Sequence, residues 1–478
     1  MHHNLKISEK QILSDPVWAY TKLQPYNIDQ EKVDKLGKLR QQHQTLKKSY
    51  KKTQLETKIL SSKIGKARQT GQTIQQFMPH MQEKSTHLKA LKGGLDRTER
   101  QILELFDAGK DEKYKPPFTV SFDFRRTYPT SRVNTSKISI SLLDDQENEW
   151  NTYVDKNPAA SIYHRAEWRE VIQQSYGHES FYFVARDTDK NIVGILPLIR
   201  LSSHLFGDFL VSMPYFMEGG AVADHPDIEH ILIQHANHYA TSRGVDHIEY
   251  RDDTPRAELP VRYDKVNMIL TLPETRTELW MGFSSKVRAQ IKRAKRENPK
   301  IRFGGKEYLD DFYSVYARNM RDLGSPPHSK EFLRNTLDSF SDNSWIIVLY
   351  INSRPVAAGF LIGHGETLDI PLASSIRAVN PLGINMLMYS ELLKFAIRRS
   401  FRYFGFGRST RDSGTFRFKQ QWGAQPKQLY WHYGLVKKGE VPHLSPANPK
   451  YALMINVWKR LPVKLTQWMG PRIVKNIP

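Results

Sequence analysis

Apolar residues recur at helical spacing over two long stretches near the beginning of the chain. The first stretch carries Val33, Leu36, Leu39, Leu46, Leu55, Ile59 and Ile64, and the second carries Ile74, Phe77, Met81, Leu88, Leu91, Leu95, Ile102 and Leu105. Steps of three and four residues give each helix one apolar face. The turn residues Thr70 and Gly71 separate two arms of matching length. The pattern predicts a long antiparallel α-helical coiled-coil hairpin in residues 1–106.

From residue 142 the pattern changes to short apolar strands and helices, and one plan occurs twice. A helix around Trp168 precedes two apolar strands in residues 181–200, and a helix around Tyr316 precedes two more in residues 345–364. A further helix and strand follow each pair, at an offset of roughly 160 residues. The pattern predicts an α+β fold with a duplicated domain of acyltransferase type. We expect a linker at 107–141, domains at 142–272 and 273–437, and a basic amphipathic tail at 438–478.

The composition excludes several kinds of chemistry. The chain has 478 residues and no cysteine, which removes thiol nucleophiles, disulfides and thiolate metal sites. Its 17 histidines form no HExxH motif and no paired spacing with a carboxylate, so we expect no metal. No apolar run approaches the roughly 18 to 20 residues that span a bilayer, and the polar start lacks a signal-peptide core. We expect a cytoplasmic protein, with contact at the inner face of the membrane left open.

The net charge of +21 points to a polyanionic partner. Between Arg40 and Lys92 the chain has twelve Lys or Arg residues and two Asp or Glu residues. A solvated coiled coil ordinarily mixes both signs, so this surplus indicates a surface for a phosphate backbone. The candidate RNA-binding residues are Arg40, Lys47, Lys48, Lys51, Lys52, Lys58, Lys63, Lys66 and Arg68. A coiled coil that only dimerises the chain is the alternative.

The hairpin also carries a specific motif, LSSKIGKARQTGQ from Leu60 to Gln72, preceded by Ile28-Asp29 and Leu39-Arg40. These segments resemble the N-terminal tRNA-binding domain of seryl-tRNA synthetases. In that family the hairpin grips the long variable arm and elbow of the tRNA. The resemblance implies a tRNA partner, possibly a long-variable-arm species, and makes serine the best guess for the amino acid. No catalytic motif of the synthetase follows, so only RNA binding is implied.

The segment FGFGRSTRDSGTFRFKQQWG, residues 404–423, concentrates aromatic residues, glycines and cations. Its first residues alternate as in a strand, and their glycines let a ligand approach the backbone. Lys419 stands between Phe418 and Trp422, where a desolvated cation would stabilise negative charge on a reacting carbonyl. The alternative is an aromatic core segment whose charges face water.

Three segments extend this observation: FSSKVRAQIKRAKREN (283–298), MRDLGSPPHSKEFL (320–333) and FGFGRSTRDSGTFRFKQQWGAQP (404–426). With the runs SIYHRAEW, GILPL and LFGDFLVSMPYFMEGG, they resemble the Fem-type aminoacyltransferases, in particular the FemAB-like proteins associated with exosortase and exopolysaccharide systems. The resemblance covers nearly all of residues 146–437. It implies tandem acetyltransferase-like (GNAT) domains that move an aminoacyl group from charged tRNA to an amine of an envelope or exopolysaccharide precursor. No metal, resident cofactor or covalent intermediate is implied.

The same resemblance implies roles for individual residues. Lys419 would be the cation near the reacting groups, and Phe418 would shape the site beside it. The cations Arg288, Lys292 and Arg293 would face phosphates of the tRNA acceptor end or of a lipid-linked acceptor, with a solvated basic face as the alternative. Arg408 is a candidate to hold the acceptor because of its position on the FGRS turn, and not because of the resemblance. The remaining substrate-binding candidates are Ser409, Phe416 and Trp422.

Two other functions stay open. Acetyltransferases of this fold bind the coenzyme pyrophosphate in a loop of the type R/Q-x-x-G-x-G/A. The segment RAVNPLGINM has Asn380 where the first glycine is expected and keeps only Gly383. This departure weakens, but does not remove, the second hypothesis, which is an acyl-coenzyme A-dependent N- or O-acyltransferase of polysaccharide with a dimerising coiled coil. A non-catalytic RNA-binding protein is the third hypothesis. The cationic tail from residue 451 would lie on an anionic membrane surface or dock on the domain.

Overall fold

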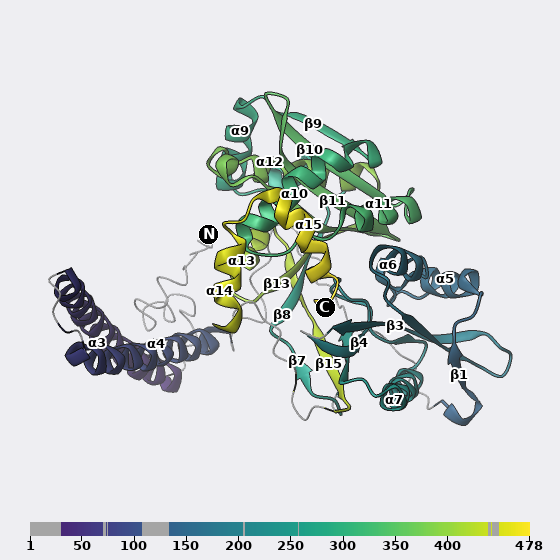
Figure 1. The fold of residues 1–478 in the computed structure, drawn as a ribbon, viewed down its shortest axis with the longest axis horizontal. Coiled ribbons are helices and arrows are strands. Elements are labelled where there is room, and N and C mark those ends of the chain that lie inside the picture. The colour runs from purple at the N-terminus through teal and green to yellow at the C-terminus, as the bar shows by residue number, and fades with distance from the viewer. Residues whose placement is uncertain are drawn as a thin grey trace. The chain divides into compact units, whose positions relative to one another are not determined.

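The computed structural model describes residues 30–69, 73, 75–107, 133–203, 206–256, 258–437, 441 and 449–478 (Figure 1). The chain forms two compact units, Met1–Lys115 and Pro116–Pro478. Among the described residues, no helix combines the length and the apolar character needed to cross a bilayer. We describe the two units separately.

The first unit contains the helix α3 (Gln30–Gln69), the short helix η1 (Gln75–Phe77) and the helix α4 (Met78–Asp107), which follows η1 directly. Lys84 Nζ lies 2.6 Å from Glu56 Oε2, and Gly94 packs against the side chain of Leu46. The paired positions therefore run in opposite directions along the two helices.

The buried positions of α3 follow a seven-residue spacing. Leu36, His43 and Ile64 belong to one series, and Thr53 and Ala67 belong to a second. The prediction that Leu55 and Ile59 lie on the apolar face is wrong, because these side chains are 60% and 49% exposed. Both fall outside the seven-residue spacing, which a helix needs to keep one seam against its partner.

The second unit contains two sheets. The first has the order β1-β2-β3-β4-β6-β15-β7, with β5 paired to β3. Its strands are β1 (Ser139–Leu142), β2 (Ser180–Arg186), β3 (Ile192–Ser203), β4 (Gly207–Val211), β5 (Val222–Ala223), β6 (His247–Asp252), β7 (Val261–Arg262) and β15 (Tyr430–Leu435). The accompanying helices are η2 (Thr135–Lys137), α5 (Glu147–Lys156), η3 (Ile162–His164), α6 (Trp168–Tyr176) and α7 (Pro226–Arg243).

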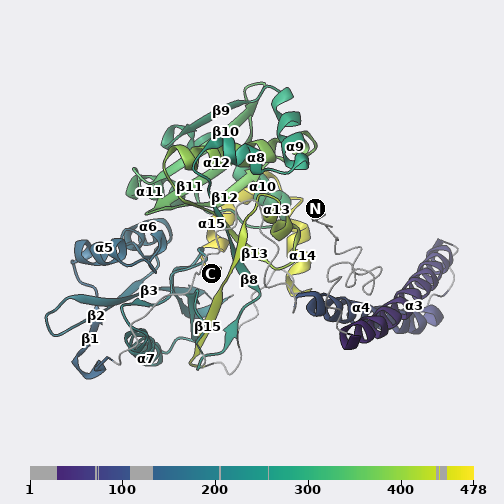
Figure 2. The same cartoon turned by 180° about the vertical axis from the view of Figure 1, so that it is seen from behind.

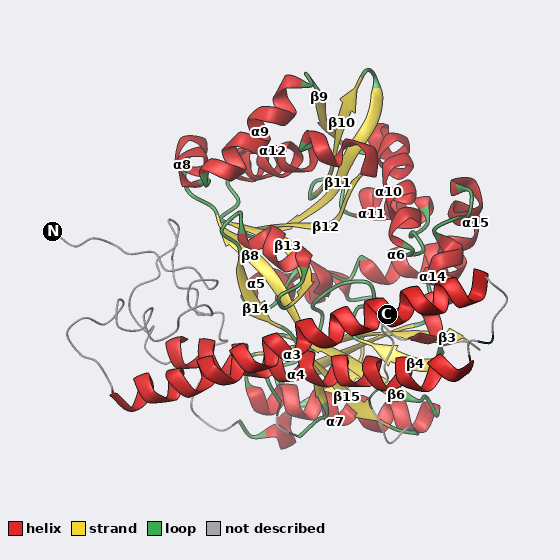
Figure 3. Ribbon diagram, turned by 90° about the vertical axis from the view of Figure 1, so that its left-hand side faces the viewer, coloured by secondary structure: helices red, strands yellow, loops and turns green. Residues whose placement is uncertain are grey.

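The second sheet has the order β14-β8-β13-β12-β11-β10-β9. Its strands are β8 (Lys265–Thr271), β9 (Lys300–Gly304), β10 (Ser344–Ile351), β11 (Arg354–His364), β12 (Thr367–Ser375), β13 (Tyr403–Thr410) and β14 (Gln425–Gln428). Its helices are α8 (Arg276–Gly282), α9 (Ser285–Arg296), η4 (Lys306–Tyr308), α10 (Leu309–Leu323), α11 (Lys330–Ser339), η5 (Arg377–Leu382), α12 (Ile384–Arg398) and α13 (Gly414–Gln420). Figure 3 shows α9 and α12 on one face of this sheet and α10 and α11 on the other.

Helix ends in the second domain follow local capping chemistry. Thr275 and Glu278 form a capping box at α8, and Ser284 caps α9 three residues before Val287. The α10 helix ends at Gly324, whose left-handed φ of 84° suits glycine. These caps mark the positions at which the helices begin or end and the chain changes direction.

The two sheets exchange strands, which corrects the expected boundary at 272/273. β8 precedes that boundary but belongs to the second sheet, and β15 follows the second sheet in sequence but lies in the first. The two crossings are adjacent: the Gln428 side chain donates to the carbonyl oxygens of Tyr263 and Lys265 at 2.8 and 2.9 Å, and Leu429 is fully buried. Figure 2 shows β8, β13 and β15 at the junction of the sheets.

The expected outer segments also contain ordered elements. The predicted linker ends inside β1, because Ser139 to Leu142 pair with β2. The tail forms α14 (Pro449–Trp458) and α15 (Val463–Val474). Trp458 Nε1 donates to Ser325 O at 3.1 Å, and Arg321 Nη1 donates to Leu461 O at 2.9 Å, so the tail packs on the second domain.

Trp168 lies at the centre of an aromatic core that both domains share. Its ring is 4.4 Å from that of Phe216 in the first domain and 4.8 Å from that of Phe340 in the second. Its indole N–H donates to Ile162 O at 2.9 Å, and the side chain is 1% exposed. The apolar residues of α6, α10 and α11 belong to the same cluster.

We predict that Trp168→Ala lowers the free energy of unfolding of the two-domain unit by about 3–5 kcal/mol, because it leaves a cavity in the shared core. The midpoint of urea unfolding measures this effect. Trp468→Ala is the matched control, since that side chain is 60% exposed, and it should change stability by less than about 0.5 kcal/mol. Equal midpoints for the two variants would contradict the shared core.

Candidate active site

The strands β12 and β13 separate partway along their length. They are parallel neighbours and pair through Thr367–Tyr403, Leu368–Phe404 and Asp369–Gly405. Beyond these pairs, β12 continues along β11 to Ser375 and β13 continues along β8 to Thr410. The two fully described strands form no further pairs with each other, so the sheet opens into a wedge whose vertex is Asp369 and Gly405.

A bulge in β13 shapes one side of the wedge. The register between β13 and β8 shifts between Gly405 and Arg408, and Gly407 has a φ of 77°, which favours glycine. The bulge turns two carbonyl groups toward α13. Lys419 Nζ donates to Gly407 O and to Arg408 O, both at 2.8 Å.

Lys419 is delivered by the short helix α13, which Ser413 caps by accepting a hydrogen bond from Phe416 N. The lysine is 8% exposed. Burial, and to a lesser extent the nearby charge of Arg408, lower its pKa to about 7. An ammonium group has three N–H donors, and the two carbonyls use two of them. The third donor is available to an anionic oxygen.

Asp369 lies at the vertex and joins the two domains. Its carboxylate packs directly on the backbone of Gly405, so a side chain at that position would collide with it. Tyr163, on η3 of the first domain, donates its hydroxyl to Asp369 Oδ2 at 3.2 Å. Gly405 and Gly407 are two residues apart on β13, a rise of about 7 Å. Asp369 and Lys419 therefore contact neighbouring parts of one strand.

A second carboxylate, Glu218, lies close to Asp369. Asn267 Nδ2 on β8 donates to Glu218 Oε1 at 3.2 Å, and Lys427 Nζ on β14 is 3.6 Å from the same oxygen and 2.8 Å from Asp253 Oδ2. The Oδ1 atom of Asn267 is buried and accepts no hydrogen bond from the described residues. One buried acceptor beside the vertex is thus without a donor among the described residues.

Asp369 holds its proton more tightly than an ordinary aspartic acid. Burial, and to a lesser extent the charge of Glu218, raise its pKa to about 7. The Tyr163 hydrogen bond and the charge of Lys427 act in the opposite direction. A carboxylate that titrates near neutrality can take a proton from an amine, and a desolvated lysine can stabilise an oxyanion.

The other residues singled out in the 404–423 segment lie in different surroundings. Phe416 and Trp422 are 6% and 2% exposed and belong to the apolar core of the second domain, so we correct their assignment from substrate contacts to packing. Phe418 is half-buried and packs edge-on against Tyr389 at 5.1 Å. Ser409 is buried, and its hydroxyl has no hydrogen-bond partner among the described residues.

Arg408 extends to the junction with the first domain. Its guanidinium lies 5.0 Å from the ring centre of Trp431 on β15. The guanidinium of Arg251 lies 4.5 Å from the centre of the same ring. The residue is exposed to solvent. Arg408 therefore carries its charge at neutral pH and is accessible to an anionic ligand.

The cations of α9 form an exposed surface on the second domain. Val287, Ile291 and Ala294 bury one face of the helix, while Lys292 and Arg293 are exposed on the other. Arg288 is half-buried and donates to Trp280 O and Met281 O at the end of α8. Two of the three predicted phosphate-binding cations are thus free for a ligand, and the third also stabilises a helix end.

The α9 helix also packs against the beginning of α12, where a coenzyme pyrophosphate would bind in an acetyltransferase. A Cβ atom on Gly383 would come within 3.0 Å of Gln290 O. Asn380 Oδ1 accepts a hydrogen bond from Ser375 Oγ at 3.0 Å, and Pro381 offers no N–H. This helix start is crowded and has few donors for an anion.

The predicted RNA-binding cations lie on α3 in the other unit. Lys47, Lys48, Lys51, Lys52 and Lys58 are exposed, and Arg40 is half-buried. The side chains of Lys63, Lys66 and Arg68 lie outside the described residues. Within the described part of the chain, no group of three His, Asp or Glu side chains is arranged to hold a metal ion.

The sequence prediction missed Asp369, Tyr163, Glu218 and Asn267. Asp369 stands between Leu368 and Ile370 in an apolar strand. A carboxylate at such a position is unusual, and this feature of the sequence could have identified Asp369 as a candidate site residue. Tyr163 and Glu218 lie in SIYHRAEW and LFGDFLVSMPYFMEGG, which contributed to the resemblance without a role.

Comparison with known proteins supports this description of the fold. Residues 283–420 match the family model of the acetyltransferase (GNAT) domain. No curated protein sequence matches the chain. The crystal structure of FemX aligns with a TM-score of 0.51 and 12% identity, covering 66% of this chain and all of FemX.

Two further solved structures align less closely. The C-terminal domain of a putative lysylphosphatidylglycerol synthetase from Agrobacterium fabrum has a TM-score of 0.41 and 12% identity, covering 65% of this chain and 95% of that domain. A tandem GNAT protein from the clavulanic acid biosynthesis pathway has a TM-score of 0.40 and 11% identity, covering 62% and 97%. The predicted α+β plan is confirmed: the second unit consists of tandem GNAT-like domains with the fold seen in FemX.

Proposed function

We propose that the protein is an aminoacyl-tRNA-dependent transferase that moves an amino acid, with serine as the best candidate, from charged tRNA to an amine. The observation that carries the proposal is the wedge between β12 and β13, where a desolvated lysine and a carboxylate of raised pKa contact neighbouring residues of β13. An aminoacyl ester is already activated. The enzyme therefore needs to align the amine, accept its proton and stabilise the oxyanion.

Each group has a defined task in this reaction. The amine nitrogen attacks the ester carbonyl, and a carbon–nitrogen bond forms while the oxyanion accepts the third N–H of Lys419. Asp369 takes the proton that the nitrogen loses. The ester carbon–oxygen bond then breaks, and that proton passes to the departing ribose oxygen. Tyr163 is a positioning residue, because it holds the Asp369 carboxylate at 3.2 Å without contacting the reacting atoms.

The helical unit supports tRNA as the donor. Its exposed cations Lys47, Lys48, Lys51, Lys52 and Lys58 suit a phosphate backbone, and the LSSKIGKARQTGQ motif resembles the seryl-tRNA synthetase arm. We interpret α3 and α4 as an antiparallel coiled-coil hairpin, since the buried positions of α3 follow a seven-residue spacing.

The acceptor is proposed to be an envelope or exopolysaccharide precursor, including lipid-linked forms, modified on the cytoplasmic side. Lys292 and Arg293 on α9, with Arg408 beside Trp431, would bind its phosphate groups. The FemAB-like resemblance is the support for this acceptor class.

An acyl-coenzyme A-dependent acyltransferase is the second candidate, because residues 283–420 match the acetyltransferase domain model. The crowded start of α12 argues against it, since Gly383 contacts Gln290 and Pro381 offers no donor to a pyrophosphate.

We predict that the protein releases one amino acid from radiolabelled pools of charged tRNA and transfers it to an amine acceptor. Lys419→Ala should reduce this transfer by about 10²–10³-fold, because it removes the donor to the oxyanion, while leaving tRNA affinity unchanged. Lys394→Ala on α12 is the control, and it should transfer normally. Transfer from acetyl-coenzyme A without tRNA would favour the second candidate instead.

The pKa values predict a bell-shaped pH profile for kcat/KM. Activity rises as pH increases through about 7, because Asp369 must lose its proton, and falls above about 7, because Lys419 must keep its own. Asp369→Asn should remove the acidic limb and Lys419→Arg the basic limb. Tyr163→Phe should shift the acidic limb to higher pH. The Tyr163 hydrogen bond lowers the pKa of Asp369, so its removal should raise that pKa. A flat profile would show that neither group takes part.

Contacts between α3 and the tRNA backbone should make the affinity for tRNA depend on the salt concentration. Replacing Lys47 and Lys51 by Ala should weaken binding of a long-variable-arm tRNA and reduce the slope of log K against log salt by about 1.5–2, because two phosphate contacts are lost. Lys156→Ala with Lys190→Ala is the control, since both are exposed lysines of the first domain. If the two double variants have the same slope, α3 does not hold the tRNA backbone.

A further inference from the structure

The C-terminal helices carry positive charge without any compensating acid. Residues 449–478 contain six Lys or Arg residues and no Asp or Glu. Of the described side chains, Lys459, Arg460, Lys464 and Arg472 are exposed. Neither the wedge nor the α3 cations include any of these residues, so the proposed function leaves this charge without a role.

One side of α15 is fixed to the protein body. Thr466, Gly470 and Val474, spaced four residues apart, are buried, and Gly470 packs against Pro327. The carbonyl oxygen of Lys475 lies 2.8 Å from His178 Nε2 and accepts a hydrogen bond from Tyr215 Oη at 2.7 Å. The helix therefore has a fixed orientation, and its opposite side is a defined surface.

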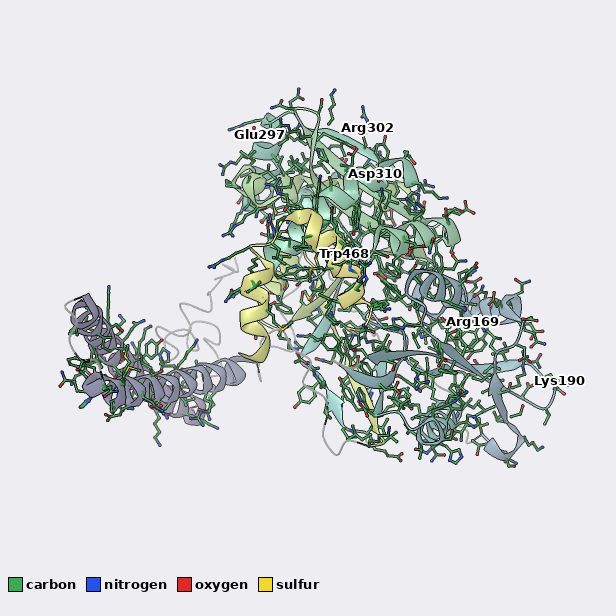
Figure 4. The ribbon with its side chains drawn as sticks, viewed as in Figure 1. Arg169, Lys190, Glu297, Arg302, Asp310 and Trp468 are labelled. Atoms are coloured by element: carbon green, nitrogen blue, oxygen red, sulfur yellow. The ribbon has the colours of Figure 1, made fainter. Side chains whose placement is uncertain are left out.

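That opposite side combines cations with apolar groups. Lys464, Trp468 and Arg472 also follow a spacing of four residues, two positions away from the buried stripe. Trp468, labelled on α15 in Figure 4, is 60% exposed. The Arg472 guanidinium lies 4.4 Å from the centre of its ring. Leu465, at 38% exposed, lies beside them.

The α14 helix extends the same combination. Met454 and Val457 are 56% and 52% exposed, and Lys459 and Arg460 follow at the end of the helix. A Cβ atom on Gly324 would contact Ile455 at 2.5 Å, so the preceding residue, Leu323, borders α14 and is 59% exposed. We call these residues of α14 and α15, with Leu323, the tail surface.

We infer that the tail surface binds the face of an anionic phospholipid membrane. Several large apolar side chains are exposed on these two consecutive helices, which is costly in water, and cations accompany them on the same helices. A tryptophan suits the headgroup level of a bilayer, aliphatic side chains enter just below it, and Lys and Arg pair with anionic headgroups. An RNA surface would use the cations but would gain nothing from exposed methionine, valine and leucine.

The inference is independent of the reaction at the wedge. It concerns only where the protein is held, and a lateral contact of this kind needs no membrane-spanning helix. A protein held at the inner membrane face would meet amphiphilic acceptors more often than one in bulk water.

Sedimentation of the full chain with lipid vesicles tests the inference. The protein should pellet with vesicles that contain phosphatidylglycerol, pellet less as salt is raised, and remain in the supernatant with phosphatidylcholine alone. The double variant Met454→Ser with Trp468→Ser, and the charge variant Lys464→Glu with Arg472→Glu, should each lower the partition coefficient by about tenfold or more.

Matched controls separate this surface from the rest of the protein. Tyr263→Ser with Met281→Ser removes apolar side chains that are 66% and 73% exposed elsewhere, and Lys300→Glu with Arg354→Glu reverses two other exposed charges. Both should bind vesicles like the wild type. The inference is wrong if the wild type does not pellet, if the tail variants pellet normally, or if those variants lose tRNA affinity while keeping vesicle affinity.

Discussion

The hydrogen bond between Tyr163 and Asp369 crosses from one domain to the other, and it depends on the aromatic core that the domains share. Tyr163 stacks on Phe216 at 4.5 Å, Phe216 packs on Trp168, and Trp168 packs on Phe340 of the second domain. Close packing of large rings allows little sliding, so the distance between η3 and β12 is held within narrow limits. The site therefore belongs to both domains.

Strand exchange adds a covalent constraint to this packing. The chain crosses between the sheets after β7 and again after β14, and Gln428 joins the two crossings by hydrogen bonds. One consequence is that Arg408 of the second sheet reaches Trp431 of the first. A second is that β8 supports β13 along its bulge, which aims the carbonyls of Gly407 and Arg408 at Lys419.

Local patterns predicted the elements well, and long-range contacts explain what they missed. The hairpins expected in 181–200 and 345–364 are β2–β3 and β10–β11, because alternating apolar residues reflect burial within one strand pair. The boundary at 272/273 differs because strand exchange leaves no mark on local periodicity. Lys419 was found through its aromatic surroundings. Asp369 was not, since its importance depends on Tyr163, 206 positions earlier in sequence.

The raised pKa of Asp369 also affects the stability of the fold, and this effect distinguishes a proton-exchanging carboxylate from a purely structural side chain. With its pKa raised from 3.8 to about 7, the folded state holds the proton across that interval, so stability falls as pH rises through it. The penalty at higher pH is roughly 4 kcal/mol, because each pKa unit corresponds to about 1.4 kcal/mol. An asparagine there would keep a polar group for Tyr163 without that penalty. A carboxylic acid at the vertex therefore lowers the stability of the fold, and its ability to exchange a proton near neutral pH is the property that an asparagine lacks.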